Sequence, residues 1–197
     1  SLLFDGEVVS NISVNSMDFS LMGREIHCVQ LSTVMTAPAF RGRGLARWLL
    51  GQVVSDWAAR CDGLYLYAGR DSLDFFRGLN FAPTREWKHS LSLSGGARRH
   101  GVRRLIAGVT EDRMLLLKKY AQSNPFSVLS VEHNPGMLLF RCMSDLRTSI
   151  YYIEQYGVAV AAESDGDTLF CHDIFGKTNA SMQEILSTLA GPETRKA

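Results

Sequence analysis

The chain lacks three features that would assign it quickly to a common class. It has no apolar run near the roughly 20 residues of a membrane-spanning helix, and no charged-then-apolar leader opens it. Its net charge is only +1, so we expect no general attraction to nucleic acid or to a membrane surface. These absences favour a cytoplasmic protein with neither a nucleic-acid nor a membrane partner.

Metal-ligand spacing is also lacking. No Cys-x-x-Cys pair occurs among the four cysteines, which are Cys28, Cys61, Cys142 and Cys171. We expect reduced core residues and no metal site. The run Cys171-His172-Asp173 contains nucleophile chemistry, but neighbours on a strand point to opposite faces, so these three cannot form a triad among themselves.

The most informative segment present runs from Val34 to Ala46: a strand end, a proline turn and a glycine-rich loop that opens into a helix. The first N–H groups of a helix have no intrahelical partner, and the helix dipole adds positive potential there. Gly42 and Gly44 let an anion approach these groups, while Arg41 and Arg43 add fixed charge. The segment predicts a pyrophosphate site; an ordinary solvated turn is the alternative.

The pattern around this loop alternates strands and helices. We expect a mixed, mostly antiparallel α+β fold flanked by helices, because short alternating strands are separated by turn residues and amphipathic runs. The expected strands of the first half are 2–5, 8–17, 26–34, 64–67 and 81–93, and the expected helices are 45–61, ended by Asp62-Gly63, and 72–79.

Here the chain resembles the GNAT superfamily of acyl-CoA-dependent N-acetyltransferases, over roughly residues 2 to 93. The family's loop pattern is matched by Arg41, Gly44 and Ala46, preceded by the usual proline, Pro38. A second family block is matched by Phe75-Phe76-Arg77-Gly78-Leu79-Asn80-Phe81. Two blocks at this separation are far more specific than either alone.

The resemblance implies acetyl-CoA as co-substrate and an amine, either a small molecule or a protein, as acceptor. In the family, pantetheine pairs with backbone groups of the strand before the loop, and the loop holds the pyrophosphate. The implied cofactor-binding residues are Val34, Met35, Thr36, Arg41, Gly42, Arg43, Gly44, Leu45, Ala46 and Phe76. Backbone N–H groups around Val34 would polarise the thioester carbonyl.

Several positions depart from the family pattern. Phe76 stands where members often have a proton-donating Tyr, and Gln30 stands where some have a carboxylate base; neither side chain can take that role. Gly69 replaces a frequent cofactor-contacting Asn. Glu25 and His27 are alternative bases on the same strand, but alternation places both on the face opposite Gln30. The catalytic residues therefore stay unknown.

The composition changes at residues 94–104, a glycine- and arginine-rich stretch. We expect domains at 1–94 and 105–197, joined by a linker at 95–104. The cluster Arg98, Arg99, Arg103 and Arg104 is either a solvated linker or a contact for the cofactor's 3′-phosphate or an acidic partner.

The second half has the element order of the start of a GNAT fold. Its expected helices are 110–122, 135–146 and 181–189, and its expected strands are 150–153, 157–164 and 168–175. The segment Gly176–Ser181 lacks the arginine and glycine spacing of a phosphate loop. The second half therefore resembles a degenerate GNAT copy without a cofactor.

Two functions remain open from the sequence: an active acetyl-CoA-dependent N-acetyltransferase, or an acyl-CoA-binding regulatory module with impaired or lost catalysis. Family members normally have a strand and two helices before the first strands seen here, and these help to form the acceptor side. Their absence indicates that they have been removed or come from elsewhere. An incomplete core or an open strand edge would also favour a homo-oligomer.

Overall fold

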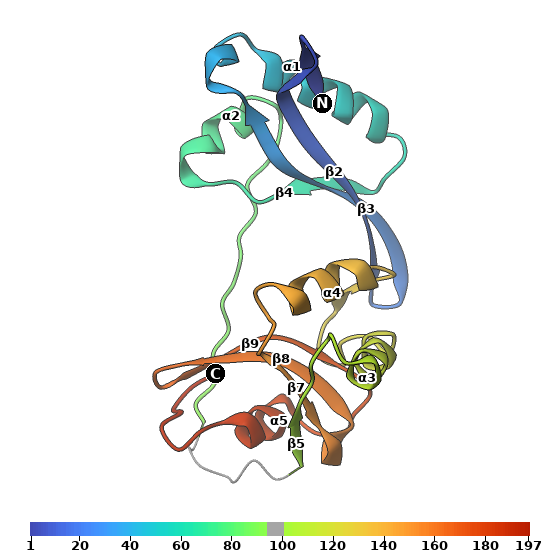
Figure 1. Ribbon diagram of the computed structural model, residues 1–197, viewed down its shortest axis with the longest axis vertical. Coiled ribbons are helices and arrows are strands. Elements are labelled where there is room, and N and C mark those ends of the chain that lie inside the picture. The colour runs from blue at the N-terminus through green and yellow to red at the C-terminus, as the bar shows by residue number, and fades with distance from the viewer. Residues whose placement is uncertain (94–100) are drawn as a thin grey trace. The chain divides into compact units, whose positions relative to one another are not determined.

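The computed structural model describes residues 1–93 and 101–197 (Figure 1). The chain divides into two compact units, residues 1–86 and 87–197. The mixed α+β fold class is confirmed in both. Within the described residues, no helix has the length and apolar character needed to cross a membrane.

The first unit is a sheet with two helices. Its elements are β1 (Leu2–Phe4), β2 (Glu7–Leu21), β3 (Arg24–Thr36), the 3-10 turn η1 (Pro38–Phe40), α1 (Leu45–Trp57), β4 (Gly63–Leu66), η2 (Arg70–Ser72) and α2 (Leu73–Arg77). The strand order is β1-β2-β3-β4; the first three strands are antiparallel, and β4 runs parallel to β3. The sheet thus changes direction next to the strand that leads into the glycine loop.

The core of this unit lies between the sheet and α1. Val29 and Leu31 of β3 pack with Leu49 and Leu50 of α1, as the amphipathic pattern of this helix predicts. The helix ends at Trp57, earlier than expected, and Asp62-Gly63 does not end it. Instead, Gly63 begins β4, and an Asp62 carboxylate oxygen accepts a hydrogen bond from the His27 amide at 2.8 Å.

The second unit contains a four-stranded antiparallel sheet. Its strand order is β5-β7-β8-β9. The elements are β5 (Val102–Arg104), α3 (Thr110–Tyr120), β6 (Leu129–Glu132), α4 (Pro135–Met143), β7 (Ile150–Ile153), η3 (Glu154–Tyr156), β8 (Val158–Asp165), β9 (Thr168–Phe175) and α5 (Met182–Leu189).

Strand β8 is buried on both faces. Val158 and Val160 pack in a cluster with α5, whereas Ala159 and Ala161 pack in a second cluster with residues of α3 and α4. The Ser181 hydroxyl and the Glu184 side chain form a reciprocal capping box at the start of α5. These features fix the three-layer arrangement of this unit.

The structure corrects the interpretation of the middle of the chain. The predicted strand at 81–93 is wrong: residues 82–91 have no regular structure, and residue 92 forms only an isolated bridge to Lys196. The Leu91 and Leu93 amides bond to carbonyls of Ala197 and Arg195, which places this stretch in the second unit. Extended residues alone do not make a strand without a partner.

The predicted linker at 95–104 also differs from the structure at its end, because Val102–Arg104 form β5 against β7. Arg98 and Arg99 lie outside the described residues. Strand β6 was not predicted either, whereas β7 and β9 have their predicted bounds. The interpretation of the second half as a degenerate copy stays a prediction.

Candidate functional site

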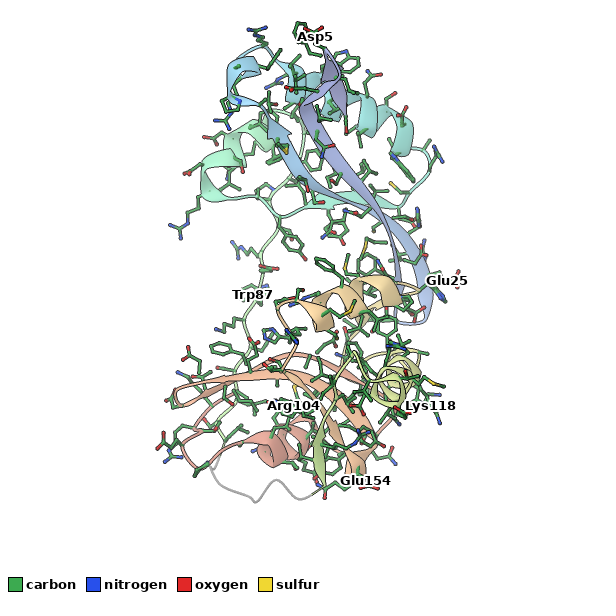
Figure 2. All side chains as sticks on the ribbon, in the orientation of Figure 1. Asp5, Glu25, Trp87, Arg104, Lys118 and Glu154 are labelled. Atoms are coloured by element: carbon green, nitrogen blue, oxygen red, sulfur yellow. The ribbon has the colours of Figure 1, made fainter. Side chains whose placement is uncertain are left out.

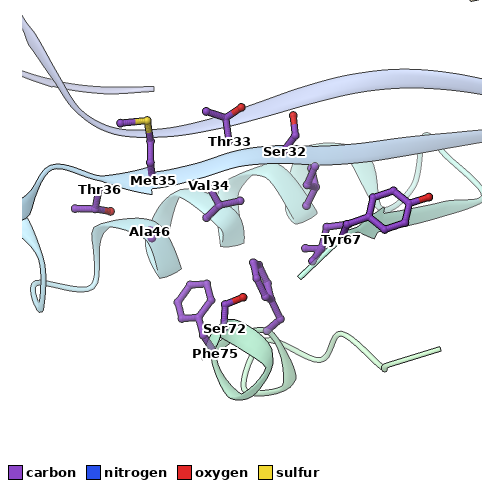
Figure 3. Close-up of a pocket in the computed structure, with 12 residues that line it drawn as sticks. Ser32, Thr33, Val34, Met35, Thr36, Ala46, Tyr67, Ser72 and Phe75 are labelled. Carbon is purple, nitrogen blue, oxygen red and sulfur yellow. The ribbon is translucent and has the colours of Figure 1, made fainter. Parts of the chain in front are cut away.

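A cavity of about 300 Å³ opens where β3 and β4 part (Figure 3). The two strands pair only from Cys28 to Leu31, opposite Gly63 to Leu66. Beyond that point, the side of β3 that faces β4 has no partner strand in the described residues. We name this space the strand-gap cavity; its lining is Leu31, Ser32, Thr33, Val34, Met35, Thr36, Ala46, Leu66, Tyr67, Ser72, Phe75 and Phe76.

A β-bulge distorts β3 beside this cavity. Asn11 pairs with Met35 and Ser13 pairs with Ser32, so β3 has one residue more than β2 over this interval. Thr33 has a φ of +50°, in the left-handed region that a β-branched residue rarely adopts. Such strain costs on the order of 1–3 kcal/mol and is found mainly at functional sites. The bulge turns the backbone next to Val34 out of the regular ladder.

A second cavity of about 290 Å³ lies at the glycine loop, and we name it the loop cavity. Its lining is Thr36, Phe40, Arg41, Gly42, Gly44, Leu45, Ala46, Arg47 and Phe75. The two cavities adjoin, because Thr36, Ala46 and Phe75 line both. Figure 3 shows Val34 and Phe75 pointing into the space beside Ala46 at the start of α1.

The loop has the backbone conformation that its glycines predict. Gly42 and Gly44 have φ values of +75° and +76°, and Gly44 is the residue before the first turn of α1. No side chain caps this helix start, and no acidic residue lies in its first turn. The first-turn N–H groups and the positive end of the helix dipole therefore face the loop cavity without compensation from a capping side chain.

The arginines near the loop differ in their roles. Arg41 donates from Nε to the Thr36 carbonyl at 3.1 Å, which ties the loop to the end of β3, and it lines the loop cavity. Arg43 instead donates to the Ala39 carbonyl at 3.2 Å and covers the Phe40 ring, and it lines neither cavity. Arg47, which the sequence did not single out, lines the loop cavity and donates to the Gly78 carbonyl at 3.2 Å.

The expected cofactor-binding residues other than Arg43 thus gather around the two cavities. Phe76 is buried, 8% exposed, between Phe75 and Phe81, with ring centroids 5.1 and 6.0 Å away. Sequence reasoning missed Thr33, Arg47, Tyr67, Ser72 and Phe75. Only Phe75 had a signal, since it belongs to the same block as Phe76.

The residues considered as bases do not line the cavities. Neither Gln30 nor Glu25 nor His27 lines them, and Glu25 lies at the opposite end of β3 from the bulge (Figure 2). The His27 imidazole Nδ1 lies 2.7 Å from an Asp18 carboxylate oxygen, within hydrogen-bond distance at the surface. Asn80 has a φ of +65°, a left-handed conformation that asparagine tolerates better than most side chains.

The run 171–173 forms no catalytic group. Burial raises the pKa of the Cys171 thiol to about 12, so the thiol stays protonated at neutral pH. The His172 imidazole lies 3.3 Å from a Glu163 carboxylate oxygen, whereas Asp173 accepts a hydrogen bond from Asn124 at 2.7 Å. The side chains of His172 and Asp173 thus bond to different partners and not to each other, and the three residues form no triad, as predicted.

Comparison with known proteins supports the interpretation of the first unit. The family model of the acetyltransferase (GNAT) domain matches residues 2–83. No curated protein matches the sequence.

Solved structures share the fold. A GCN5-related N-acetyltransferase from Kribbella flavida has 15% identity and a TM-score of 0.59, over 98% of this chain and 50% of that chain. Eis1 from Mycobacterium abscessus has 10% identity and a TM-score of 0.63, over 98% and 54%. A probable N-acyltransferase from Enterococcus faecalis V583 has 14% identity and a TM-score of 0.59, over 98% and 52%.

This chain therefore spans about half the length of these three structures. At such low identity the likeness concerns the fold, and the sequence match concerns the segment that holds both cavities. Residues 2–83 thus match the family model of the GNAT acetyltransferase domain, and the fold agrees with that match.

Proposed function

We propose that the protein is an acetyl-CoA-dependent N-acetyltransferase whose first unit binds the cofactor in the strand-gap and loop cavities. The observation that carries this proposal is the continuity of the two cavities, which share Thr36, Ala46 and Phe75. One elongated ligand with a phosphate end and a thioester end fits such a site. Acyl transfer is the activity of the family whose model matches this segment.

The loop cavity would hold the pyrophosphate. The first-turn N–H groups of α1 supply donors, and Gly42 and Gly44 keep side chains away from them. Arg41 and Arg47 supply positive charge from two sides of the loop. Since Arg41 is anchored through Nε to the Thr36 carbonyl, its remaining donors are held in place before the ligand arrives.

The strand-gap cavity would hold the pantetheine and the thioester. The side of β3 that faces the gap offers backbone groups of Val34, Met35 and Thr36 to the pantetheine amides. The bulge at Thr33 directs neighbouring backbone groups away from β2, where an N–H group near Val34 can polarise the thioester carbonyl. The strand pairing on both sides of the bulge would hold this strained geometry in place before the ligand binds.

The reaction follows from direct attack. The lone pair of a neutral acceptor amine attacks the thioester carbonyl carbon, the carbon–sulfur bond breaks, and CoA leaves as a thiolate. The surplus proton of the nitrogen passes to water or to the thiolate. Positioning alone can supply roughly 7–11 kcal/mol of barrier reduction, so Phe76, which cannot donate a proton, is compatible with turnover.

Calorimetric titration with acetyl-CoA tests the binding step. The parent chain should bind, and a variant combining Arg41→Ala with Gly44→Glu should not, because it removes one cation and places an anion at the helix start. Arg43→Ala is the matched control, since Arg43 lines neither cavity and should retain nearly full affinity. Equal binding by all three, or none by the parent, would refute the proposed cofactor site.

An amine panel with detection of free CoA thiol tests the chemistry. Release of CoA that depends on the amine and is lost in the double variant would support acyl transfer. Tight cofactor binding with no transfer to any amine in the panel would contradict the enzymatic part of the proposal while leaving the binding part intact.

A further inference from the structure

A groove of about 690 Å³ lies within the second unit, and we name it the β9 groove. It is bounded by β9, by α5 and by the extended segment that starts at Trp87 (Figure 2). It shares no residue with the strand-gap or loop cavities. Its volume lies within the range of about 300–1,000 Å³ that is typical of small-molecule sites.

The groove is open because the outer edge of β9 is bridged only at its ends. At one end the Leu169 amide donates to the Lys196 carbonyl at 2.9 Å. At the other end the Gly176 amide donates to the Ser123 carbonyl at 3.0 Å. No strand pairs with this edge between the two bridges in the residues that the structure describes, which leaves room for a ligand along Phe170–Ile174.

The floor of the groove is apolar. Leu169, Ile174 and Leu186 lie at its base but are only 1–2% exposed, so the apolar surface that a ligand can cover comes from the half-buried Leu91, Phe170 and Met182. Met182, at the start of α5, and Leu91 are partly buried against the core cluster that contains the three residues at the base. A polar ligand without a hydrocarbon part would leave this apolar surface exposed to water, whereas a hydrocarbon chain would remove it from water and gain binding free energy.

Charge is distributed unevenly along the groove. The exposed Lys88 places its ammonium 4.6 Å from the centroid of the Phe170 ring and has no ion pair among the described residues. Lys196 lies 3.7 Å from an Asp167 carboxylate oxygen, which offsets its charge. Lys88 is therefore the cation of this groove that an anionic ligand can neutralise.

The far part of the groove carries the opposite sign. Asp173 lies three positions beyond Phe170, about 10 Å along an extended strand. Its Oδ1 accepts hydrogen bonds from the Asn124 side chain at 2.7 Å and from the Ile174 amide at 2.8 Å. These bonds hold the carboxyl in place, so a second carboxylate arriving at this end would meet another carboxyl group and not a cation.

We propose that the β9 groove binds a straight-chain monocarboxylate, with the carboxylate beside Lys88 and the hydrocarbon chain over Leu91 and Met182. The cation at the mouth selects an anionic head, the floor selects an aliphatic body, and Asp173 excludes a dianion. This site is independent of the proposed acyl-CoA site and does not require that function.

A matched ligand series tests the proposal by calorimetry on the full chain. Octanoate should bind more tightly than octanol and octylamine, which share its body but lack its charge, and more tightly than suberate, which adds a second carboxylate. Hexanoate should bind more weakly than octanoate by up to about 15-fold, because each buried methylene contributes about 0.8 kcal/mol. Acetate should not bind measurably.

Two lysine variants distinguish binding in the groove from nonspecific attraction of the anion to surface cations. Lys88→Met keeps the apolar stem, removes the charge and should weaken octanoate binding about three- to fivefold, without affecting octanol. Lys118→Met removes an exposed cation outside the groove and should change nothing. No octanoate binding, equal affinity for octylamine, or equal loss in both lysine variants would overturn the proposal.

Discussion

Two glycines with equally empty surroundings should respond in opposite directions to the same substitution. A Cβ atom added at Gly44 or at Gly51 would meet nothing within 4 Å. Gly44, however, has a φ of +76°, whereas Gly51 lies inside α1 with ordinary helical geometry. Any difference between Gly44→Ala and Gly51→Ala therefore reports backbone conformation and not packing.

The magnitudes follow from this geometry. Left-handed backbone costs an L-residue about 1–2 kcal/mol, and the less flexible unfolded chain of an alanine variant returns about 0.4–1 kcal/mol. Gly44→Ala should therefore lower the free energy of unfolding by about 1 kcal/mol. Gly51→Ala should raise it by about 0.5–1 kcal/mol, because alanine favours a helix interior over glycine.

Tryptophan fluorescence during urea unfolding can measure both changes. Trp48 and Trp57 both lie on α1, and a Trp87→Phe background removes the remaining tryptophan, so the signal reports the first unit. Gly44→Asn should recover part of the loss, since asparagine tolerates the left-handed region. If Gly44→Ala stabilises the first unit as much as Gly51→Ala does, the left-handed loop and the reasoning about it are wrong.

Three further predictions concern the second unit. Burial opposes ionisation of Asp112, but hydrogen bonds from the Ile106 amide and Arg103 outweigh it and hold its pKa below 3.8. Asp112→Asn should then lower the free energy of thermal unfolding by about 1–2 kcal/mol at neutral pH. This loss should shrink as the pH falls through the pKa of Asp112 in the folded protein, because the parent then loses the same charge. A difference between the two proteins that stays constant with pH would contradict this. Burial raises the pKa of Asp173 in the folded protein above its value in the unfolded chain. The contribution of this group to stability is therefore present below the pKa of the unfolded chain and is lost as the pH rises through the pKa of the folded protein. Asp173→Asn should consequently raise the melting temperature at neutral pH and leave it unchanged in acid, and a lower value at neutral pH would show that the charge stabilises the fold. Burial raises the pKa of Cys142 to about 11 and that of Cys171 to about 12. In the folded protein at about pH 8, both thiols should therefore react with a thiol reagent far more slowly than Cys61. Peptide mapping by mass spectrometry would measure the extent of modification at each cysteine.

The loop of the site could be predicted because its signals are local. Gly42 and Gly44 adopt the left-handed conformations that glycine alone adopts easily, and the apolar spacing after Leu45 specifies a helix without reference to the rest of the chain. The hairpin that connects β8 and β9 follows from Asp165-Gly166 in the same way. Each of these elements is encoded within a few residues.

The features that could not be predicted depend on distant partners. Strand β5 exists because β7 pairs with it, and its exposed arginines look like a linker in the sequence. Leu91 and Leu93 resemble strand residues because they pack on the core of the second unit, yet the segment before them has no partner strand. The bulge at Thr33 carries no glycine, so nothing in the sequence marks the extra residue.

That extra residue also changes which side chains of β3 share a face. Val29 and Leu31, two positions apart, pack against α1, and a regular strand would continue the same side at position 33. Val34 instead packs with this cluster, so the odd positions give way to the even ones after the bulge. If β3 instead ran regularly through Thr33, everything from Val34 to the end of the strand would exchange inside for outside without any change of sequence. Deleting Thr33 would remove the bulge and restore regular alternation, with Val34 still on the side of α1. The bulge at Thr33 therefore decides which side chains in the last part of β3 face α1 and which face away from it.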